Sequence, residues 1–228
     1  MKLSIVIPCL NEAKAIGACV KEAKQSLLAL KIDGEVVVAD NGSTDDSKEI
    51  ATKAGARVVH VQERGYGSAL RNGIISAQGE FVIMGDGDGS YDFTEIGRFM
   101  EKFDQGYDLV MGNRFRGGIE PGAMPFMNKH IGNPALTFIT RVLFGKAFGD
   151  TQCGLRGGKR QVILDMNLKS DHMEYASEMV VKALKSPLRL AEVPVKLRND
   201  DPSRRPHLRP FRDGIRHLKF LLCEKFTT

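Results

Sequence analysis

The fold of this chain is decided by the stretch Phe81-Val82-Ile83-Met84-Gly85-Asp86-Gly87-Asp88-Gly89-Ser90. Its apolar start predicts a short buried strand, and the glycines that follow predict the end of that strand. Because Gly87 separates Asp86 from Asp88, a bend there can turn both carboxylates toward one point. Two negative charges held that close repel each other, and a divalent cation relieves the repulsion. The stretch therefore predicts a strand that ends in a cation site.

The other ligand atoms near this pair are also oxygens, from Ser90 and Asp92. Oxygen ligands favour Mg²⁺ or Mn²⁺ over Zn²⁺. An isolated Asp-x-Asp is more often a solvated acidic turn. Here the pair follows an apolar strand, and the flanking glycines let a bulky anion approach the backbone. A site for a metal ion and a diphosphate is therefore favoured.

Composition restricts the class of protein. The chain has 228 residues, of which 42% are hydrophobic and 27% charged, and these values suit one α/β domain with at most a small appendage. The net charge of +5 is compatible with nucleic acid, an anionic membrane surface or phosphorylated substrates. Nucleic acid is disfavoured because the late arginines lack interleaved aromatic residues and the chain has no tryptophan.

Cysteine usage and hydropathy predict where the chain works. The four cysteines are scattered, which predicts reduced thiols in a cytosolic protein rather than disulfides or a zinc site. The apolar start is too short for a signal peptide and runs directly into Pro8. No apolar run is long enough to span a bilayer.

Strands and helices alternate over the first hundred or so residues, which predicts a parallel or mixed sheet covered on both faces. Asp40 stands at the carboxyl end of the second strand, the usual ligand edge of such a sheet. The predicted strands in this part of the chain are 3–7, 35–39, 57–61, 81–84 and 108–111.

The second part of the chain differs in composition from the first. Residues 113–125 are rich in Gly, Arg and Pro and predict a long loop. The tail from Phe211 predicts a helix with Ile215, Leu218 and Leu222 on one face and basic residues on the others. The remaining predicted elements are helices at 127–144, 159–166 and 173–184, a turn and short strand at 149–157, a strand at 188–195 and a basic loop at 198–210.

Three motifs resemble those of the inverting family-2 glycosyltransferases of the GT-A fold in order and spacing. They are Pro8-Cys9-Leu10-Asn11-Glu12, Asp40-Asn41-Gly42-Ser43-Thr44-Asp45 and Asp86-Gly87-Asp88-Gly89-Ser90-Tyr91-Asp92. Asn113-Arg114-Phe115 and Cys153-Gly154-Leu155-Arg156 are similar to the dolichol-phosphate mannosyltransferase and polyprenyl-phosphate glucosyltransferase branch. The resemblance covers nearly the whole chain.

The resemblance implies an α/β fold of GT-A type: a Rossmann-like, mixed but mostly parallel sheet flanked by helices. It implies a single catalytic domain over residues 1–198, with a nucleotide-sugar half at 1–112 and an acceptor half at 113–198. A basic loop and an amphipathic tail helix occupy residues 199–228.

The resemblance also implies a donor site. The residues expected to bind the nucleotide sugar are Pro8, Leu10, Asn11, Glu12, Asp40, Asn41, Arg71, Asp86, Gly87 and Asp88. Asp86, Asp88 and Ser90 are the expected metal ligands, and Ser90 stands where some relatives place a third ligand. Leu10 departs from the family pattern, because an aromatic residue that can stack on the base is usual there.

The acceptor site follows from the same resemblance, with Arg114, Lys129, Arg156, Arg204 and Arg205 expected to bind an acceptor phosphate. The expected catalytic residues are Asp88, Arg114 and Glu178. A lipid phosphate is already ionised at pH 7 and needs no general base, whereas a sugar hydroxyl needs a carboxylate. Glu178, Glu174 and Asp150 are the candidates for that base.

The sequence thus predicts an inverting transferase that moves glucose or mannose from UDP-glucose or GDP-mannose to a polyprenyl or dolichyl phosphate. Mg²⁺ or Mn²⁺ would stabilise the leaving diphosphate. The tail is either a solvated helix that caps the domain or an interfacial helix that contacts an anionic membrane at its cytosolic face, and the second is favoured. The alternatives are a soluble acceptor and a non-catalytic regulatory module that binds sugar nucleotides, and the sequence leaves a homo-oligomer open.

Overall fold

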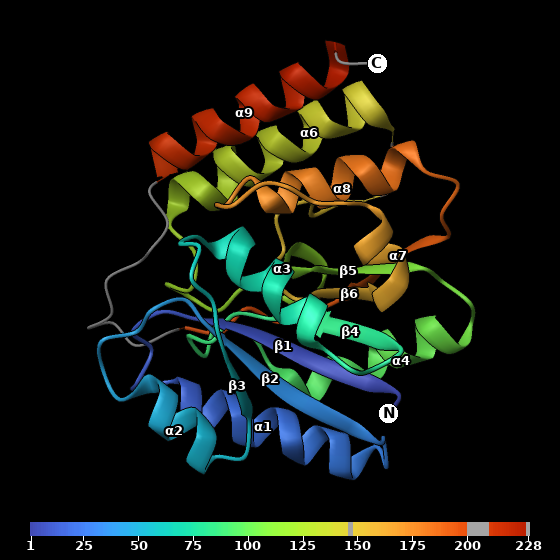
Figure 1. Ribbon diagram of the computed structural model, residues 1–228. Coiled ribbons are helices and arrows are strands. Elements are labelled where there is room, and N and C mark those ends of the chain that lie inside the picture. Colours follow the sequence, from blue (N-terminus) through green and yellow to red (C-terminus); the bar gives the residue numbers. More distant parts are fainter. Residues whose placement is uncertain (146–147, 200–209, 227–228) are drawn as a thin grey trace.

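A computed structural model describes residues 1–145, 148–199 and 210–226, and one seven-stranded sheet crosses the molecule (Figure 1). The strand order is β3-β2-β1-β4-β6-β5-β7, and β6 runs antiparallel to both of its neighbours while the other pairs are parallel. The predicted mixed, mostly parallel sheet is confirmed. The strands are β1 (Leu3–Cys9), β2 (Gly34–Asp40), β3 (Arg57–His60), β4 (Phe81–Met84), β5 (Leu109–Asn113), β6 (Arg156–Lys159) and β7 (Leu190–Pro194).

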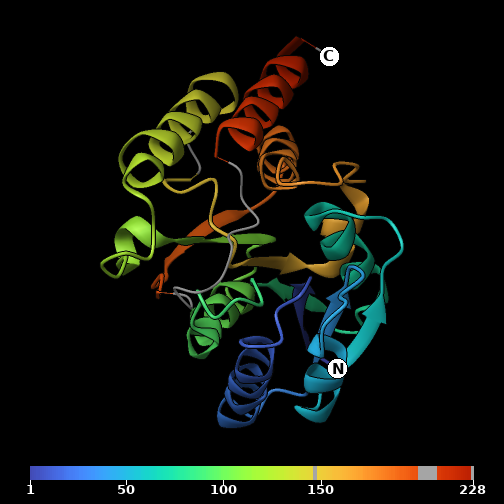
Figure 2. The same ribbon diagram turned by 90° about the vertical axis from the view of Figure 1, so that its left-hand side faces the viewer.

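Helices cover both faces of the sheet (Figures 1 and 2). Successive strand residues point to opposite faces, so Ile5 and Ile7 pack in one core and Val6 in the other. The first face carries α1 (Ile16–Ala29), α2 (Ser47–Lys53), the 3₁₀ turn η1 (Phe93–Glu95) and α4 (Ile96–Asp104). The second carries α3 (Tyr66–Ser76), α7 (Arg160–Asp165) and α8 (Tyr175–Lys185).

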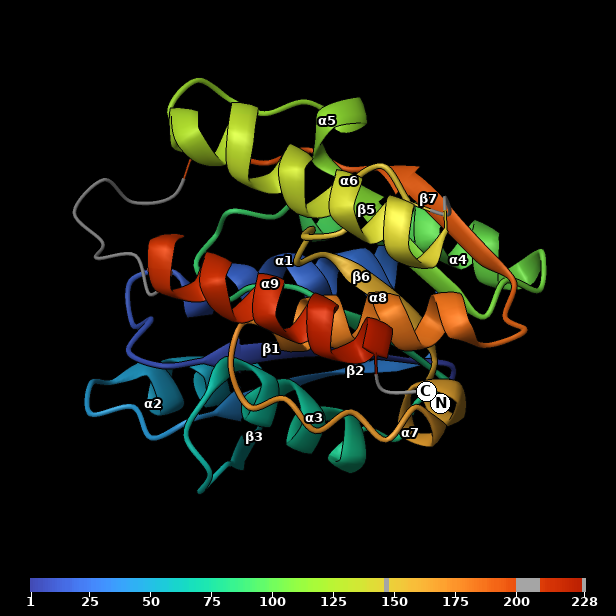
Figure 3. The same ribbon diagram turned by 90° about the horizontal axis from the view of Figure 1, so that it is seen from above.

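An outer layer lies beyond α8 (Figures 1 and 3). It consists of the π-helical turn η2 (Asn128–Gly132), α6 (Asn133–Phe144) and the tail helix α9 (Pro210–Phe226). Lys185 of α8 pairs with Glu224 at 3.1 Å, and Lys225 donates to the carbonyl of Leu143 at 3.2 Å. These contacts hold α9 against its two neighbours.

Helix α9 turns a polar face inward. Asp213, His217 and Leu221 are buried, and His217 Nδ1 lies 2.8 Å from the Ser177 hydroxyl of α8. The apolar face predicted from the sequence is therefore exposed, with Ile215 at 67% and Leu222 at 44%. This helix therefore packs through Leu221 and the hydrogen bond of His217 rather than through its predicted apolar stripe.

One short helix differs from the sequence prediction. The predicted loop at 113–125 begins instead with α5 (Arg114–Gly117). The Asn113 side chain accepts a hydrogen bond from the Arg116 amide at 3.0 Å, which satisfies a donor in the first turn. Asn is a preferred N-cap residue, so the signal was present in the sequence.

The strand order brings the motifs together. Because β1 lies between β2 and β4, the segments that follow these three strands meet at one edge of the sheet. Because β6 is antiparallel, the segment that precedes it, residues 149–155, arrives at that same edge. The motifs identified in the sequence therefore lie together at this edge of the sheet.

Candidate active site

The two carboxylates after β4 are held by different parts of the chain: Asp86 by distant residues, Asp88 by its neighbour Ser90. Asp86 Oδ1 accepts a hydrogen bond from the Tyr66 hydroxyl at 2.9 Å. Asp88 Oδ1 accepts from the Ser90 amide at 3.0 Å and from its hydroxyl at 2.6 Å. Gly154 lies so close that a Cβ there would stand 2.6 Å from Asp86 Oδ2. The orientation of both carboxylates is set before any ligand binds.

This arrangement fits Mg²⁺ or Mn²⁺ with a diphosphate. Both carboxylates are half-buried at the ligand edge of the sheet. Within residues 1–145, 148–199 and 210–226 no group of three or more His, Cys, Asp or Glu side chains could hold a metal ion. An ion that Asp86 and Asp88 bind would take its remaining ligands from phosphate oxygens and water, as Mg²⁺ commonly does. Ser90 supports Asp88 in this geometry, and its role as a metal ligand stays a prediction.

The loop after β1 is joined to the loop after β2. Asn11 has a positive φ of 57°, its amide donates to Ser43 Oγ at 2.9 Å and its side-chain oxygen accepts from the Thr44 amide at 2.8 Å. The Glu12 amide donates to Ser47 Oγ at 2.8 Å. The two loops therefore form one rigid wall, in which the predicted nucleotide-binding residues Pro8, Leu10, Asn11 and Glu12 stand together.

Asp40 and Asn41 brace this wall. Asp40 is fully buried and accepts from the Gly42 and Ser43 amides, each at 3.2 Å. The Asn41 side chain donates to the Glu63 carbonyl at 2.7 Å and accepts from the Gly65 amide at 2.6 Å. Both side chains thus shape the loops at the ends of β2 and β3, and contact with a nucleotide stays a prediction.

Arg71 and Glu178 both hold the loop at residues 169–171. Arg71 pairs with Asp171 at 2.7 Å. The Glu178 carboxylate accepts from the Lys169 and Ser170 amides at 2.9 and 2.7 Å and pairs with Lys182 at 2.7 Å. Burial alone would raise the pKa of Glu178, but these hydrogen bonds together lower it. A carboxylate stabilised in its charged form is a weak base, so the structure gives Glu178 an anchoring role, and its catalytic role stays a prediction.

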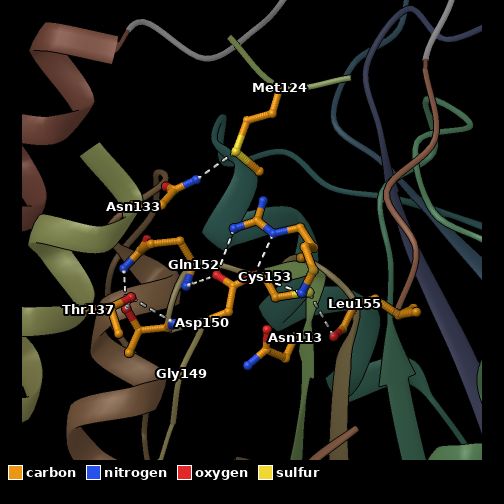
Figure 4. Close-up of polar contacts among 12 residues, drawn as sticks. Asn113, Met124, Asn133, Thr137, Gly149, Asp150, Gln152, Cys153 and Leu155 are labelled. Atoms are coloured by element: carbon orange, nitrogen blue, oxygen red, sulfur yellow. Dashed lines mark hydrogen bonds and ion pairs between the residues drawn. The ribbon is translucent and has the colours of Figure 1, made fainter. Parts of the chain in front are cut away.

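Arg114 forms a buried pair with Asp150, which Figure 4 labels. Asp150 Oδ2 accepts from Arg114 Nε at 2.7 Å and from the Arg114 amide at 3.1 Å, while Oδ1 accepts from Nη2 at 2.8 Å. Arg114 is 7% exposed and Asp150 is fully buried. The pair fixes the position of one edge of the guanidinium. It also engages the Asp150 carboxylate, which the sequence offered as a candidate base, in hydrogen bonds to Arg114.

Arg156 is buried differently. It is fully buried on β6 opposite Met84 and Met111, with its Cζ 5.9 Å from the Tyr175 ring centroid. Among the described residues, none of its three side-chain nitrogens has a hydrogen-bond partner. Its charge acts on Tyr66: burial and Asp86 raise the pKa of that hydroxyl, whereas Arg156 opposes the rise. The guanidinium therefore belongs electrostatically to the Tyr66–Asp86 side of the site.

Three more residues are predicted from the sequence to bind the acceptor phosphate. Lys129 is half-buried in η2. Arg204 and Arg205 lie outside the described residues.

A family model described as Glycosyl transferase family 2 matches residues 4–165. The chain belongs to glycosyl transferase family 2. The resemblance seen in the motifs is thereby confirmed.

Two relatives from Haloferax volcanii are informative. One is the low-salt glycan biosynthesis hexosyltransferase Agl6, which is 38% identical over 96% of this chain, and this chain spans only 53% of its length. The other is a dolichyl-phosphate hexose transferase, which is 30% identical over 86% of this chain and 82% of its own length.

Solved structures confirm the GT-A type of fold. Glucosyl-3-phosphoglycerate synthase from Mycobacterium tuberculosis, in complex with Mn²⁺, UDP and phosphoglyceric acid, superposes with a TM-score of 0.77 at 20% identity. The match covers 100% of this chain and 79% of the synthase chain. A second structure of that synthase contains Mg²⁺ and UDP.

In this family 2 protein, two tyrosines of the site were missed from the sequence. Tyr66 stands between Gly65 and Gly67 at the start of α3, and nothing local shows that its hydroxyl reaches Asp86. Tyr91 lies inside the Asp86–Asp92 motif, and its hydroxyl accepts from the Gly154 amide at 2.7 Å. Both contacts join segments that are far apart in the sequence.

A hollow of about 390 Å³ lies far from these residues. It is lined by Leu28 of α1 and by Gly34 and Glu35 at the amino end of β2, whereas the acidic motif follows the carboxyl end of β4. Because of this position, the hollow is not part of the site that the sequence motifs form.

Proposed function

We propose that this protein transfers a hexose, glucose or mannose, from UDP-glucose or GDP-mannose to a polyprenyl or dolichyl phosphate with inversion. Asp86 and Asp88 would bind Mg²⁺ or Mn²⁺ and, through it, the donor diphosphate. Support comes from the oxygen-only pair at the ligand edge, from Mn²⁺ and UDP in the structural neighbour, and from the relative named as a dolichyl-phosphate hexose transferase.

The distribution of exposed apolar side chains carries the lipid part of this proposal. Large apolar side chains are exposed together on the outer layer and the segment before it, namely Phe126, Met127, Ile131, Phe138, Val142, Ile215, Leu218, Leu222 and Phe226. Exposed patches of this kind on soluble proteins commonly mark a binding surface. The basic residues Arg141, Arg212 and Lys219 are exposed on the same helices, which suits an anionic membrane surface. Of the helices within the described ranges, none has both the length and the apolar character to cross a bilayer.

The proposed chemistry follows from charge. When the sugar–diphosphate bond breaks, negative charge develops on the leaving nucleotide diphosphate, and a bound metal ion supplies the compensating positive charge. The acceptor phosphate oxygen is ionised at pH 7 and would attack the opposite face of the sugar without a general base. Asp150 engages Nε and Nη2 of Arg114, so Nη1 is the proposed donor to the acceptor phosphate. A fixed guanidinium would orient that phosphate against the donor.

A soluble phosphorylated acceptor is the second candidate, because the structural neighbour is bound to phosphoglyceric acid. Such an acceptor does not account for the exposed apolar surface. A non-catalytic module would bind the donor without turning it over. Comparing transfer to a polyprenyl phosphate with transfer to 3-phosphoglycerate separates all three.

The test of the metal site is calorimetric titration with UDP-glucose and with GDP-mannose, each with Mn²⁺ and with a chelator. We expect one donor to bind only with the metal, and Asp88→Asn to abolish that binding. Asp104→Asn is the matched control, because Asp104 pairs with Lys2 on the surface at 2.8 Å. Unchanged metal-dependent affinity in Asp88→Asn would show that the diphosphate binds elsewhere.

A further inference from the structure

A shallow groove of about 250 Å³ is lined by residues of α5 and α6. Its lining comprises Phe115, Pro134, Thr137, Phe138, Arg141 and Gly149. Two aromatic rings, a proline and the aliphatic stem of an arginine make it largely apolar.

The groove is lined in a way that suits an apolar chain. The Phe115 and Phe138 side chains are 40% and 68% exposed, although large apolar side chains are usually covered. The Thr137 hydroxyl is buried and lies 3.1 Å from the Thr151 hydroxyl, so its polar group is already hydrogen-bonded within the protein. A ligand in the groove would therefore meet apolar carbon rather than unsatisfied polar atoms.

The groove adjoins the acceptor half of the proposed site. Phe115 follows Arg114 in the chain, and Gly149 precedes Asp150, so the buried pair lies one residue away on both sides (Figure 4). From Asp150 the chain continues to Gly154, which touches Asp86. One continuous segment thus connects the groove to the acidic pair.

We propose that this groove binds the isoprenoid units of the acceptor that are closest to its phosphate. This inference rests on the proposed function and adds where the lipid chain lies. A phosphate held by the Arg114 guanidinium has its first carbons beside Phe115, and the opposing Phe138 ring covers them from α6. Arg141 also lines the groove and adds a second positive charge there.

A bilayer is the other apolar partner that this part of the molecule could meet. The lining residues of α5 and α6 face one another across a hollow, which matches a single branched chain. A flat membrane contact would use exposed α6 side chains both inside and outside the lining, namely Phe138 at 68% and Val142 at 67%. Only the membrane contact therefore depends on Val142.

The test compares Phe138→Ser with Val142→Ser and with Ile75→Ser, an exposed position on α3. Phe, Ile, Val and Ser have similar helix propensities, so folding should be little affected. The acceptors are a water-soluble polyprenyl phosphate of two or three isoprene units and 3-phosphoglycerate, both assayed without vesicles or detergent at saturating donor. Donor affinity is measured for each variant by titration.

We expect Phe138→Ser to lower kcat/KM for the short polyprenyl phosphate by about fivefold or more, the loss of one partly buried aromatic contact. Val142→Ser and Ile75→Ser should stay within about twofold, and donor affinity should be unchanged in all three. Equal losses in Phe138→Ser and Val142→Ser would overturn the groove. So would a loss in Phe138→Ser that appears only when vesicles are added, because that result assigns the face to the membrane.

The failure of the groove and the failure of the proposed function are distinguishable. If the parent protein glycosylates polyprenyl phosphate and Phe138→Ser does so equally well, only the groove is wrong. If the parent protein binds donor but transfers sugar only to 3-phosphoglycerate, the proposed acceptor is wrong and the groove inference falls with it.

Discussion

Two of the arginines that the structure describes are buried, Arg114 and Arg156, and their surroundings differ. Arg114 is held by three hydrogen bonds that involve the Asp150 carboxylate. Arg156 is more completely buried, yet its nitrogens find no hydrogen-bond partner among the described residues, and its Cζ lies 5.9 Å from the Tyr175 ring centroid. Asp150 therefore neutralises the charge of Arg114, whereas the described residues offer the Arg156 nitrogens no hydrogen-bond partner.

The difference indicates different roles. A buried pair contributes most when both members are present, since removing one leaves an uncompensated charge. A buried charge without hydrogen bonds costs free energy, which proteins tolerate mainly where the charge serves a ligand or a site. Arg114 is therefore expected to matter for folding as well as for the acceptor. Arg156 is expected to matter for the electrostatics around Tyr66 and Asp86.

The largest expected effect comes from breaking the compensated pair. Asp150→Asn should lower the free energy of unfolding by about 3–5 kcal/mol, because Arg114 keeps its buried charge and loses its partner. Urea denaturation followed by circular dichroism measures this. Asp104→Asn removes a surface pair and should cost no more than about 1 kcal/mol. A cost for Asp150→Asn as small as the control's would mean that the pair contributes nothing to stability.

A smaller effect on folding and a clear effect on activity are expected for Arg156→Met. No hydrogen bond is lost and the volume is roughly kept, so the free energy of unfolding should change by less than about 1 kcal/mol, or even rise. Metal-dependent kcat/KM for the donor should fall at least about tenfold, because a positive charge near the diphosphate site is removed.

The matched control for this arginine is Arg189→Met. Arg189 also stands over a tyrosine, with its Cζ 5.0 Å from the Tyr107 ring centroid, but on an exposed part of the chain away from the acidic pair. Full activity in Arg156→Met would refute the electrostatic role of Arg156. A destabilisation like that of Asp150→Asn would place both buried arginines in the same class.

The last effect concerns His217, whose pKa is lowered to about 4, chiefly by burial, with Asp213 opposing and Arg156 adding to the shift. Because this folded-state pKa lies below the ordinary 6.5, the unfolded chain binds more protons between about pH 4 and pH 6.5. Stability should therefore fall as the pH drops through that window, by about 3 kcal/mol at most. In Arg156→Met the pKa of His217 should rise and this acid loss should shrink.

NMR titration of the His217 ring together with urea denaturation at pH 4.5 and pH 6.5 checks both statements. His217→Asn, which cannot titrate in this range, should remove this part of the pH dependence. An unchanged His217 pKa in Arg156→Met would mean that the uncompensated charge does not reach α9.

Local signals predicted part of this molecule well. The strand Phe81–Met84 was predicted with its observed bounds, because an apolar run bounded by glycine leaves little choice. The family-2 motifs and the mixed sheet were also predicted, since each motif carries its own turn chemistry. The short helix at Arg114–Gly117 was missed because its composition reads as a loop and only the Asn113 cap indicates otherwise.

By itself, the sequence determined the family, the carboxylate pair and the strands that carry it, because those features depend on neighbouring residues. Only the tertiary structure decided that Tyr66 holds Asp86, that Asp150 neutralises Arg114 and that α9 buries His217 rather than its apolar stripe. These outcomes depend on which segments the strand order brings together at the sheet edge and on which polar groups then lack water. These contacts are hydrogen bonds between residues far apart in the chain, and no local sequence pattern predicts them.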